Sequence, residues 1–288
     1  MKKIIEFINS FQFESTELTV SIEIGEILIQ LSTDNEIIAE FVKNRYRQFL
    51  SISNFLDYRI EIFIAPALYF KSPDANKEFF NKQKFSKDTN FIYSNGYIGY
   101  LNKKIKAGKV IVNDDIPDTW VEHFLRFAFS WMALEDDCLF FHGAGIVNNN
   151  SGYVFFGPSN AGKTTVTEFS ANYSILGDDM VMLRKSNGKF HVYATPFNIN
   201  MGNIKLTNTK KRIKGFYRLR QDRSNYLKRM KNSKAVAELM SCVPLSNNNF
   251  NGNLKAFSVC SEIVDKIPCY DLHFTRDDSF WRLINDHS

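Results

Sequence analysis

The residues best suited to chemistry form one short segment, Gly157-Pro158-Ser159-Asn160-Ala161-Gly162-Lys163-Thr164. This segment fits the pattern G-x-x-x-x-G-K-[ST], in which the glycines let successive backbone N–H groups turn inward around phosphate oxygens. Lys163 can reach the outer phosphates, and the Thr164 hydroxyl can ligate Mg²⁺. The segment therefore predicts a nucleotide site, with Lys163 as a catalytic cation and with contacts that extend to Thr165.

Two adjacent carboxylates, Asp178 and Asp179, follow the short apolar segment 174–177. Neighbouring side chains on an extended segment point to opposite sides, so the two acids can do different work. One could hold a metal ion, while the other accepts a proton from a hydroxyl within hydrogen-bond reach. The alternative is an ordinary Asp-Asp turn at the edge of a sheet.

His142 lies in the apolar strand that precedes the loop, within Phe140-Phe141-His142-Gly143. If the two strands pair, this histidine comes close to the phosphates or to the acid pair. A carboxylate neighbour would then orient the imidazole and raise its proton affinity. The alternative is a histidine that only packs in the core.

The elements that must position these residues can be predicted from hydrophobic periodicity. Strands are expected over 139–147, over 153–156 directly before the loop, and over 180–183 directly after the acids. A helix is expected over 163–171, where its positive end would face the phosphates. A further core helix is expected to begin at Pro117, because proline suits the first helical turn.

As a set, these residues resemble the catalytic domain of HPr kinase/phosphorylase and the wider group of HPr kinase-like proteins, which share a P-loop core with phosphoenolpyruvate carboxykinases. The resemblance rests on the order and spacing of His142-Gly143, the loop 157–164 and Gly177-Asp178-Asp179. It implies a serine kinase that uses ATP and Mg²⁺ and phosphorylates a peptide or small protein. Lys163 would bind the β- and γ-phosphates, Thr164 and Asp179 would hold Mg²⁺, and Asp178 would be the base, supported by His142.

Weaker similarity to the divergent HPr kinase-like proteins extends over Thr195-Pro196-Phe197, residues 215–243 and residues 267–272. True HPr kinases differ from this chain at Pro158 and Thr165, and their later Glu-containing signature is not found. The HPr protein is therefore not the expected acceptor, and phosphorylase activity is not expected. Two alternatives stay open: a nucleotide-binding regulatory or scaffold module without transfer activity, and a small-molecule kinase.

Positive charge is concentrated in one part of the chain. Residues 205–234 contain twelve Lys or Arg and one acidic residue, a net +11 that leaves 5 − 11 = −6 for the rest of the chain. Arg218 and Arg220 alternate with Tyr217 and Leu219 as in a strand. Their face could contact nucleotide phosphates or an acidic acceptor, or it could simply be solvated. No fold typical of nucleic-acid binding accompanies it, so nucleic acid is not an expected partner.

The length of 288 residues predicts two domains. The region 1–115 reads as an accessory α+β domain, with a hairpin at Asn95-Gly96, and similarity suggests the accessory domain of the divergent branch. The region 116–288 reads as an α/β, HPr kinase-like P-loop domain with a mixed sheet. Self-association is left open.

The composition indicates a globular protein, with 44% hydrophobic and 23% charged residues. No export signal and no membrane-spanning segment is expected. The four cysteines are too far apart for a metal knuckle or a disulfide framework, so buried thiols and a cytoplasmic location are expected.

Overall fold

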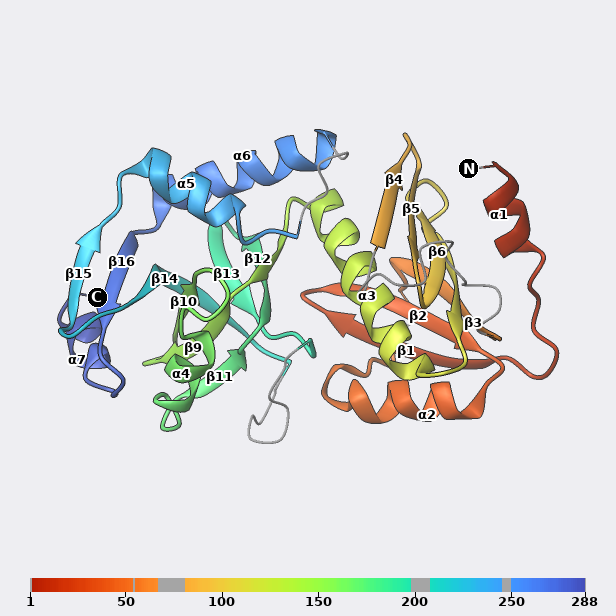
Figure 1. The fold of residues 1–288 in the computed structure, drawn as a ribbon, viewed down its shortest axis with the longest axis horizontal. Coiled ribbons are helices and arrows are strands. Elements are labelled where there is room, and N and C mark those ends of the chain that lie inside the picture. The colour runs from red at the N-terminus through yellow and green to blue at the C-terminus, as the bar shows by residue number, and fades with distance from the viewer. Residues whose placement is uncertain (1, 54, 67–80, 198–207, 245–249, 288) are drawn as a thin grey trace. The chain divides into compact units, whose positions relative to one another are not determined.

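The computed structural model describes residues 2–53, 55–66, 81–197, 208–244 and 250–287 (Figure 1). Contacts divide the chain into two compact units, the first ending at Met132 and the second beginning at Ala133. Helix α3 (Pro117–Glu135) begins at the expected proline and contains this division. The sequence-based boundary between residues 115 and 116 lies just before this helix, and as a statement about separately folding domains it stays a prediction.

The first unit is built on a mixed sheet of seven strands in the order β1-β2-β3-β7-β6-β5-β4. Two pairings, β2 with β3 and β3 with β7, are parallel, and the others are antiparallel. The predicted hairpin at Asn95-Gly96 is confirmed as the turn between β5 and β6. The strands are β1 (Leu18–Ile24), β2 (Ile27–Thr33), β3 (Tyr58–Ala65), β4 (Asn81–Phe85), β5 (Thr89–Ser94), β6 (Tyr97–Asn102) and β7 (Ala107–Asn113), and the helices before α3 are α1 (Lys2–Asn9) and α2 (Glu36–Arg45).

The second unit contains a mixed sheet of nine strands, seven of which follow the order β11-β9-β10-β14-β13-β12-β8, while β16 pairs with β14 and β15. The two mixed sheets make the protein α/β in the broad sense. The strands are β8 (Leu139–His142), β9 (Ala144–Asn148), β10 (Ser151–Phe156), β11 (Ser174–Gly177), β12 (Met180–Ser186), β13 (Lys189–Tyr193), β14 (Lys210–Gln221), β15 (Tyr226–Arg229) and β16 (Cys269–Phe274). The helices are α4 (Lys163–Glu168), α5 (Asn232–Met240), α6 (Phe250–Lys266) and α7 (Phe280–Asp286).

The strand predicted over residues 139–147 is divided in two at Gly143. β8 pairs with β12, whereas β9 pairs with β10 and β11. A Cβ atom at Gly143 would lie 2.9 Å from the Phe141 ring and 3.0 Å from the Phe155 carbonyl oxygen, so only glycine fits where the chain changes partners. The helix predicted over 163–171 ends earlier, at Glu168.

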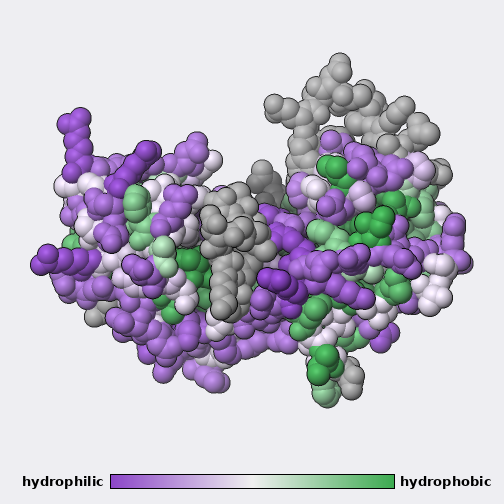
Figure 2. Space-filling model, turned by 90° about the horizontal axis from the view of Figure 1, so that it is seen from below, coloured by the Kyte–Doolittle hydropathy of each residue, from purple (hydrophilic) through white to green (hydrophobic). Residues whose placement is uncertain are grey.

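The core of the second unit confirms the alternation predicted for β14. Tyr217 and Leu219 are buried against Tyr153 and Phe155 of β10, so Arg218 and Arg220 project from the other face. The face of the second unit that Figure 2 shows is largely hydrophilic. Within the part of the chain that the structure describes, no helix has the length and apolar character needed to span a membrane.

Candidate functional site

The segment 157–162 forms a tight loop between β10 and α4, as the sequence predicts. Gly157 and Gly162 have φ angles of 156° and 108°, which favour glycine. A Cβ atom at either position would also lie only 2.8 Å from a neighbour, the Ala161 Cβ atom or the Phe274 ring. Both glycines are therefore required by backbone conformation and by space.

The ammonium group of Lys163 lies against the loop itself. Its Nζ atom donates to the carbonyl oxygens of Gly157 at 3.2 Å and Pro158 at 3.4 Å. Burial lowers the pKa of Lys163, and the nearby Asp179 carboxylate and Cys242 thiol offset part of this decrease. A partly desolvated cation in this position is well placed to attract an anion, because an anion would restore the stabilisation lost with water.

Neighbouring strand ends support the loop. The Gln221 side-chain amide at the end of β14 donates to the carbonyl oxygen of Asn160 at 3.1 Å. The Phe274 ring at the end of β16 packs against Gly162. The loop therefore rests on two strands that come much later in the chain, and sequence analysis identified neither support.

Asp178 and Asp179 lie between β11 and β12 and are almost fully buried, at 3% and 8% exposure. His142 Nε2 lies 3.0 Å from Asp179 Oδ1. The resemblance implied that His142 supports Asp178, so the histidine contact that the structure shows is with the other acid of the pair. The two come together because β8 pairs with β12, which places His142 opposite Met180.

Cys242, which sequence analysis did not select, connects the histidine with the loop. Its carbonyl oxygen accepts a 2.7 Å hydrogen bond from the His142 backbone N–H. Burial raises the pKa of its thiol, and the Ser241 side chain, the Lys163 charge and the Gly157 backbone offset part of this increase. Like the other three cysteines it is free and buried, as the sequence predicts.

The arginine face of β14 converges on one buried carboxylate, Asp271, which is 4% exposed. Arg218, Arg220 and Lys234 approach its oxygens at 3.5, 3.3 and 2.5 Å, and Arg218 also lies 2.7 Å from Glu238. Arg218 pairs in register with Phe156, the last residue before the loop. The three cations and the carboxylates of Asp271 and Glu238 together carry a net charge of +1 beside the phosphate loop.

Part of the basic segment predicted from the sequence, including Lys205, lies outside the described residues. Asp271 was missed because its cationic partners are far away along the chain. The one signal was an acid inside the otherwise uncharged and largely apolar stretch 269–272.

The acid pair and the Thr164 hydroxyl offer oxygen ligands to a metal ion. Among the residues that the structure describes, no group of three His, Cys, Asp or Glu side chains forms a metal site. Mg²⁺ commonly takes only one or two carboxylates together with phosphate oxygens. The buried acid pair and the Thr164 hydroxyl at the start of α4 therefore fit Mg²⁺ by chemistry.

Comparison with known proteins finds matches among solved structures. No family model matches the chain, and no curated protein matches it. A search of solved structures finds the Hpr(Ser) kinase/phosphatase from Coxiella burnetii, at 10% identity and a TM-score of 0.32. The match covers 51% of this chain and 95% of that chain.

The chain is similar in structure to an HPr(Ser) kinase/phosphatase over half its length. A similarity of this degree does not assign an activity to the protein.

Proposed function

We propose that this protein is an ATP- and Mg²⁺-dependent, HPr kinase-like phosphotransferase that phosphorylates a hydroxyl, with a serine of a peptide or small protein as acceptor. The observation that carries this proposal is the contact of the Lys163 ammonium group with the phosphate loop, where it also interacts electrostatically with Asp179, the partner of His142. A loop of this kind binds a triphosphate tail, and neighbouring acids can serve the metal and the acceptor.

Each residue has a role in the proposal. Residues 157–165 hold the nucleotide, and Lys163 neutralises charge on its outer phosphates. Thr164 and Asp179 would hold Mg²⁺, which supplies charge neutralisation when bound. His142 orients Asp179 by contacting one of its carboxylate oxygens.

The reaction is proposed to proceed as an in-line transfer. Asp178 accepts the proton of the acceptor hydroxyl as the oxygen forms its bond to the γ-phosphorus. The bond from this phosphorus to the β–γ bridging oxygen breaks, and the electron pair leaves with ADP. Arg220 and Lys234, each with 43% of its side chain exposed, add positive charge near this path.

A second candidate is a nucleotide-binding module without transfer activity. It is favoured by the burial of both carboxylates, because a general base must be reached by its acceptor. A small-molecule kinase differs from the main proposal only in its acceptor. A cytoplasmic location also belongs to the proposal, since the four buried cysteines are all free.

The test is incubation of the full chain with Mg²⁺, γ-labelled ATP and pools of peptides and metabolites. Lys163→Ala should weaken nucleotide binding by about tenfold or more, because it removes charge-assisted hydrogen bonds to phosphate, and should abolish labelling. Lys185→Ala is the matched control, since this exposed lysine pairs with a surface glutamate, Glu262, and is not part of the phosphate loop.

The outcomes separate the candidates. Nucleotide binding without a labelled product from any pool favours the module, and a labelled metabolite favours the small-molecule kinase. Absence of heat on mixing folded protein with Mg²⁺-ATP or Mg²⁺-GTP would contradict the nucleotide site itself.

A further inference from the structure

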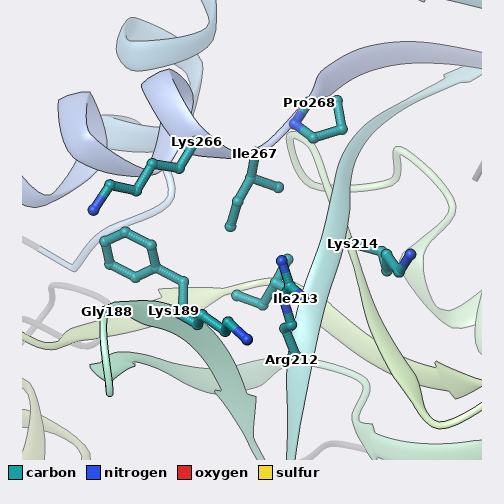
Figure 3. Close-up of a pocket in the computed structure, with 9 residues that line it drawn as sticks. Gly188, Lys189, Arg212, Ile213, Lys214, Lys266, Ile267 and Pro268 are labelled. Carbon is teal, nitrogen blue, oxygen red and sulfur yellow. The ribbon is translucent and has the colours of Figure 1, made fainter.

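The sheet of the second unit forks along one edge of β14. On this edge β13 pairs with residues 210–212 and β16 with residues 216–221, while β10 occupies the opposite edge. Residues 213–215 lie between the two pairings. A cavity of about 380 Å³ lies at this fork, lined by β13, β14 and the segment between α6 and β16 (Figure 3).

The cavity combines an apolar lining with basic residues. Phe190, Ile213 and Ile267 supply buried apolar side chains. Lys189 and Arg212 also line the cavity and are exposed. Among the described residues neither has an acidic partner within salt-bridge distance. Lys266, in contrast, is already paired with Glu262 at 2.6 Å.

We propose that this cavity is a second binding site, for a small organic anion that joins phosphate or carboxylate groups to an apolar body. Its volume lies within the roughly 300–1,000 Å³ of small-molecule sites. Arg212 can make paired hydrogen bonds to either type of anion, and the three apolar residues would contact the body of the molecule. The open edge of three residues is shorter than the ~5–6 residues of an average strand, which disfavours an added peptide strand.

This site is separate from the phosphate loop. Ile213 pairs with Gly152, at the start of β10, whereas the loop begins at Gly157, just after the end of that strand. At about 3.3 Å per residue the two sites are roughly 15 Å apart along the strand. This exceeds the Debye length of about 8 Å at physiological salt, so charge at one site is largely screened from the other.

The experiment is methyl NMR of Ile213 and Ile267 in the full chain, titrated separately with phenyl phosphate, phthalate and inorganic phosphate. We expect saturable shifts of both methyl signals with the two aromatic anions, and weaker binding of inorganic phosphate because it lacks the apolar part. A preference for phenyl phosphate or for phthalate distinguishes a phosphate from a carboxylate ligand.

Alanine substitutions test which basic side chains bind the anion. Arg212→Ala should weaken binding by about tenfold, and Lys189→Ala by several-fold, through loss of charge-assisted contacts. Lys211→Ala is the matched control, since it removes a positive charge from the same strand but does not line the cavity, and its amino group donates to Asn150. Lys163→Ala controls for binding at the phosphate loop and should leave these shifts unchanged.

Two results would overturn the proposal. One is the absence of saturable shifts at Ile213 and Ile267 with all three anions. The other is equal weakening by Arg212→Ala and Lys211→Ala, which would indicate only diffuse attraction to a basic surface.

Discussion

Asp178 and Asp179 are neighbours in the chain, yet their contacts suit them to different work. The imidazole of His142 holds one oxygen of Asp179 at 3.0 Å, and this acid also interacts electrostatically with Lys163. The Asp179 backbone oxygen accepts from Gly143, so the turn itself is anchored at the break between β8 and β9. These contacts favour Asp179 as the acid nearest the phosphates.

Amide substitutions distinguish the roles of Asp178 and Asp179. Asp178→Asn should keep nucleotide affinity and lower the transfer rate by about 10²–10⁴-fold, the usual contribution of a general base. Asp179→Asn should weaken Mg²⁺-dependent nucleotide binding, because an amide is a poorer ligand for a hard cation. Calorimetric titration and single-turnover labelling measure the two effects independently. If Asp178→Asn transfers at the wild-type rate, the roles assigned to the two acids are wrong.

At the scale of elements, helices α2 and α3 of the first unit are joined by a partly buried charged group. Arg45 Nε lies 2.7 Å from Glu122, and Arg126 approaches the same carboxylate at 3.0 Å. Burial alone would raise the pKa of Glu122, but hydrogen bonds and charge from Arg45 and Arg126 lower it overall. The ionised carboxylate therefore stabilises the folded unit.

The sign of this effect predicts how stability depends on pH. A lowered carboxyl pKa contributes stability above the unfolded value of about 4.3, and this stability is lost as pH falls through the folded value. Glu122→Gln should lower the free energy of unfolding by about 1–3 kcal/mol at pH 7, and should flatten its pH dependence in the acid range. Urea unfolding at several pH values measures both.

Glu61→Gln provides the comparison. Glu61 also pairs with a lysine, Lys109, at 2.7 Å, but 44% of its side chain is exposed. We expect Glu61→Gln to lower the free energy of unfolding by less than about 1 kcal/mol, because solvent screens exposed ion pairs. Equal changes in the free energy of unfolding for Glu122→Gln and Glu61→Gln would show that the charged group between α2 and α3 contributes no more than an exposed ion pair.

At the scale of the whole molecule, the candidate nucleotide site lies entirely within the second of the two compact units. A ligand that binds only folded protein stabilises it by about 2.7 kcal/mol at 100 times its dissociation constant. Scanning calorimetry should therefore show two transitions, with Mg²⁺-ATP at this concentration raising one by about 5–10 °C and leaving the other unchanged. A single transition that moves as a whole would show that the two units unfold together.

The sequence alone was sufficient where a feature depends on neighbouring residues. The phosphate loop was predicted because its two glycines meet local demands of backbone angle and space. The hairpin at Asn95-Gly96 and the alternation of Tyr217 and Leu219 followed for the same reason. Each depends on backbone preferences or side-chain periodicity over a few residues.

The tertiary structure decided which distant residues meet. His142 contacts Asp179 because β8 pairs with β12. Asp271 lies within salt-bridge distance of Arg220 because β16 pairs with β14. The fork that opens the second cavity likewise depends on where β13 stops pairing and β16 begins. Strand pairing brings together residues that are tens of positions apart through backbone hydrogen bonds, which almost any sequence can form. The periodicity along the chain shows which face of a strand is buried, but it does not show which distant strand is its partner.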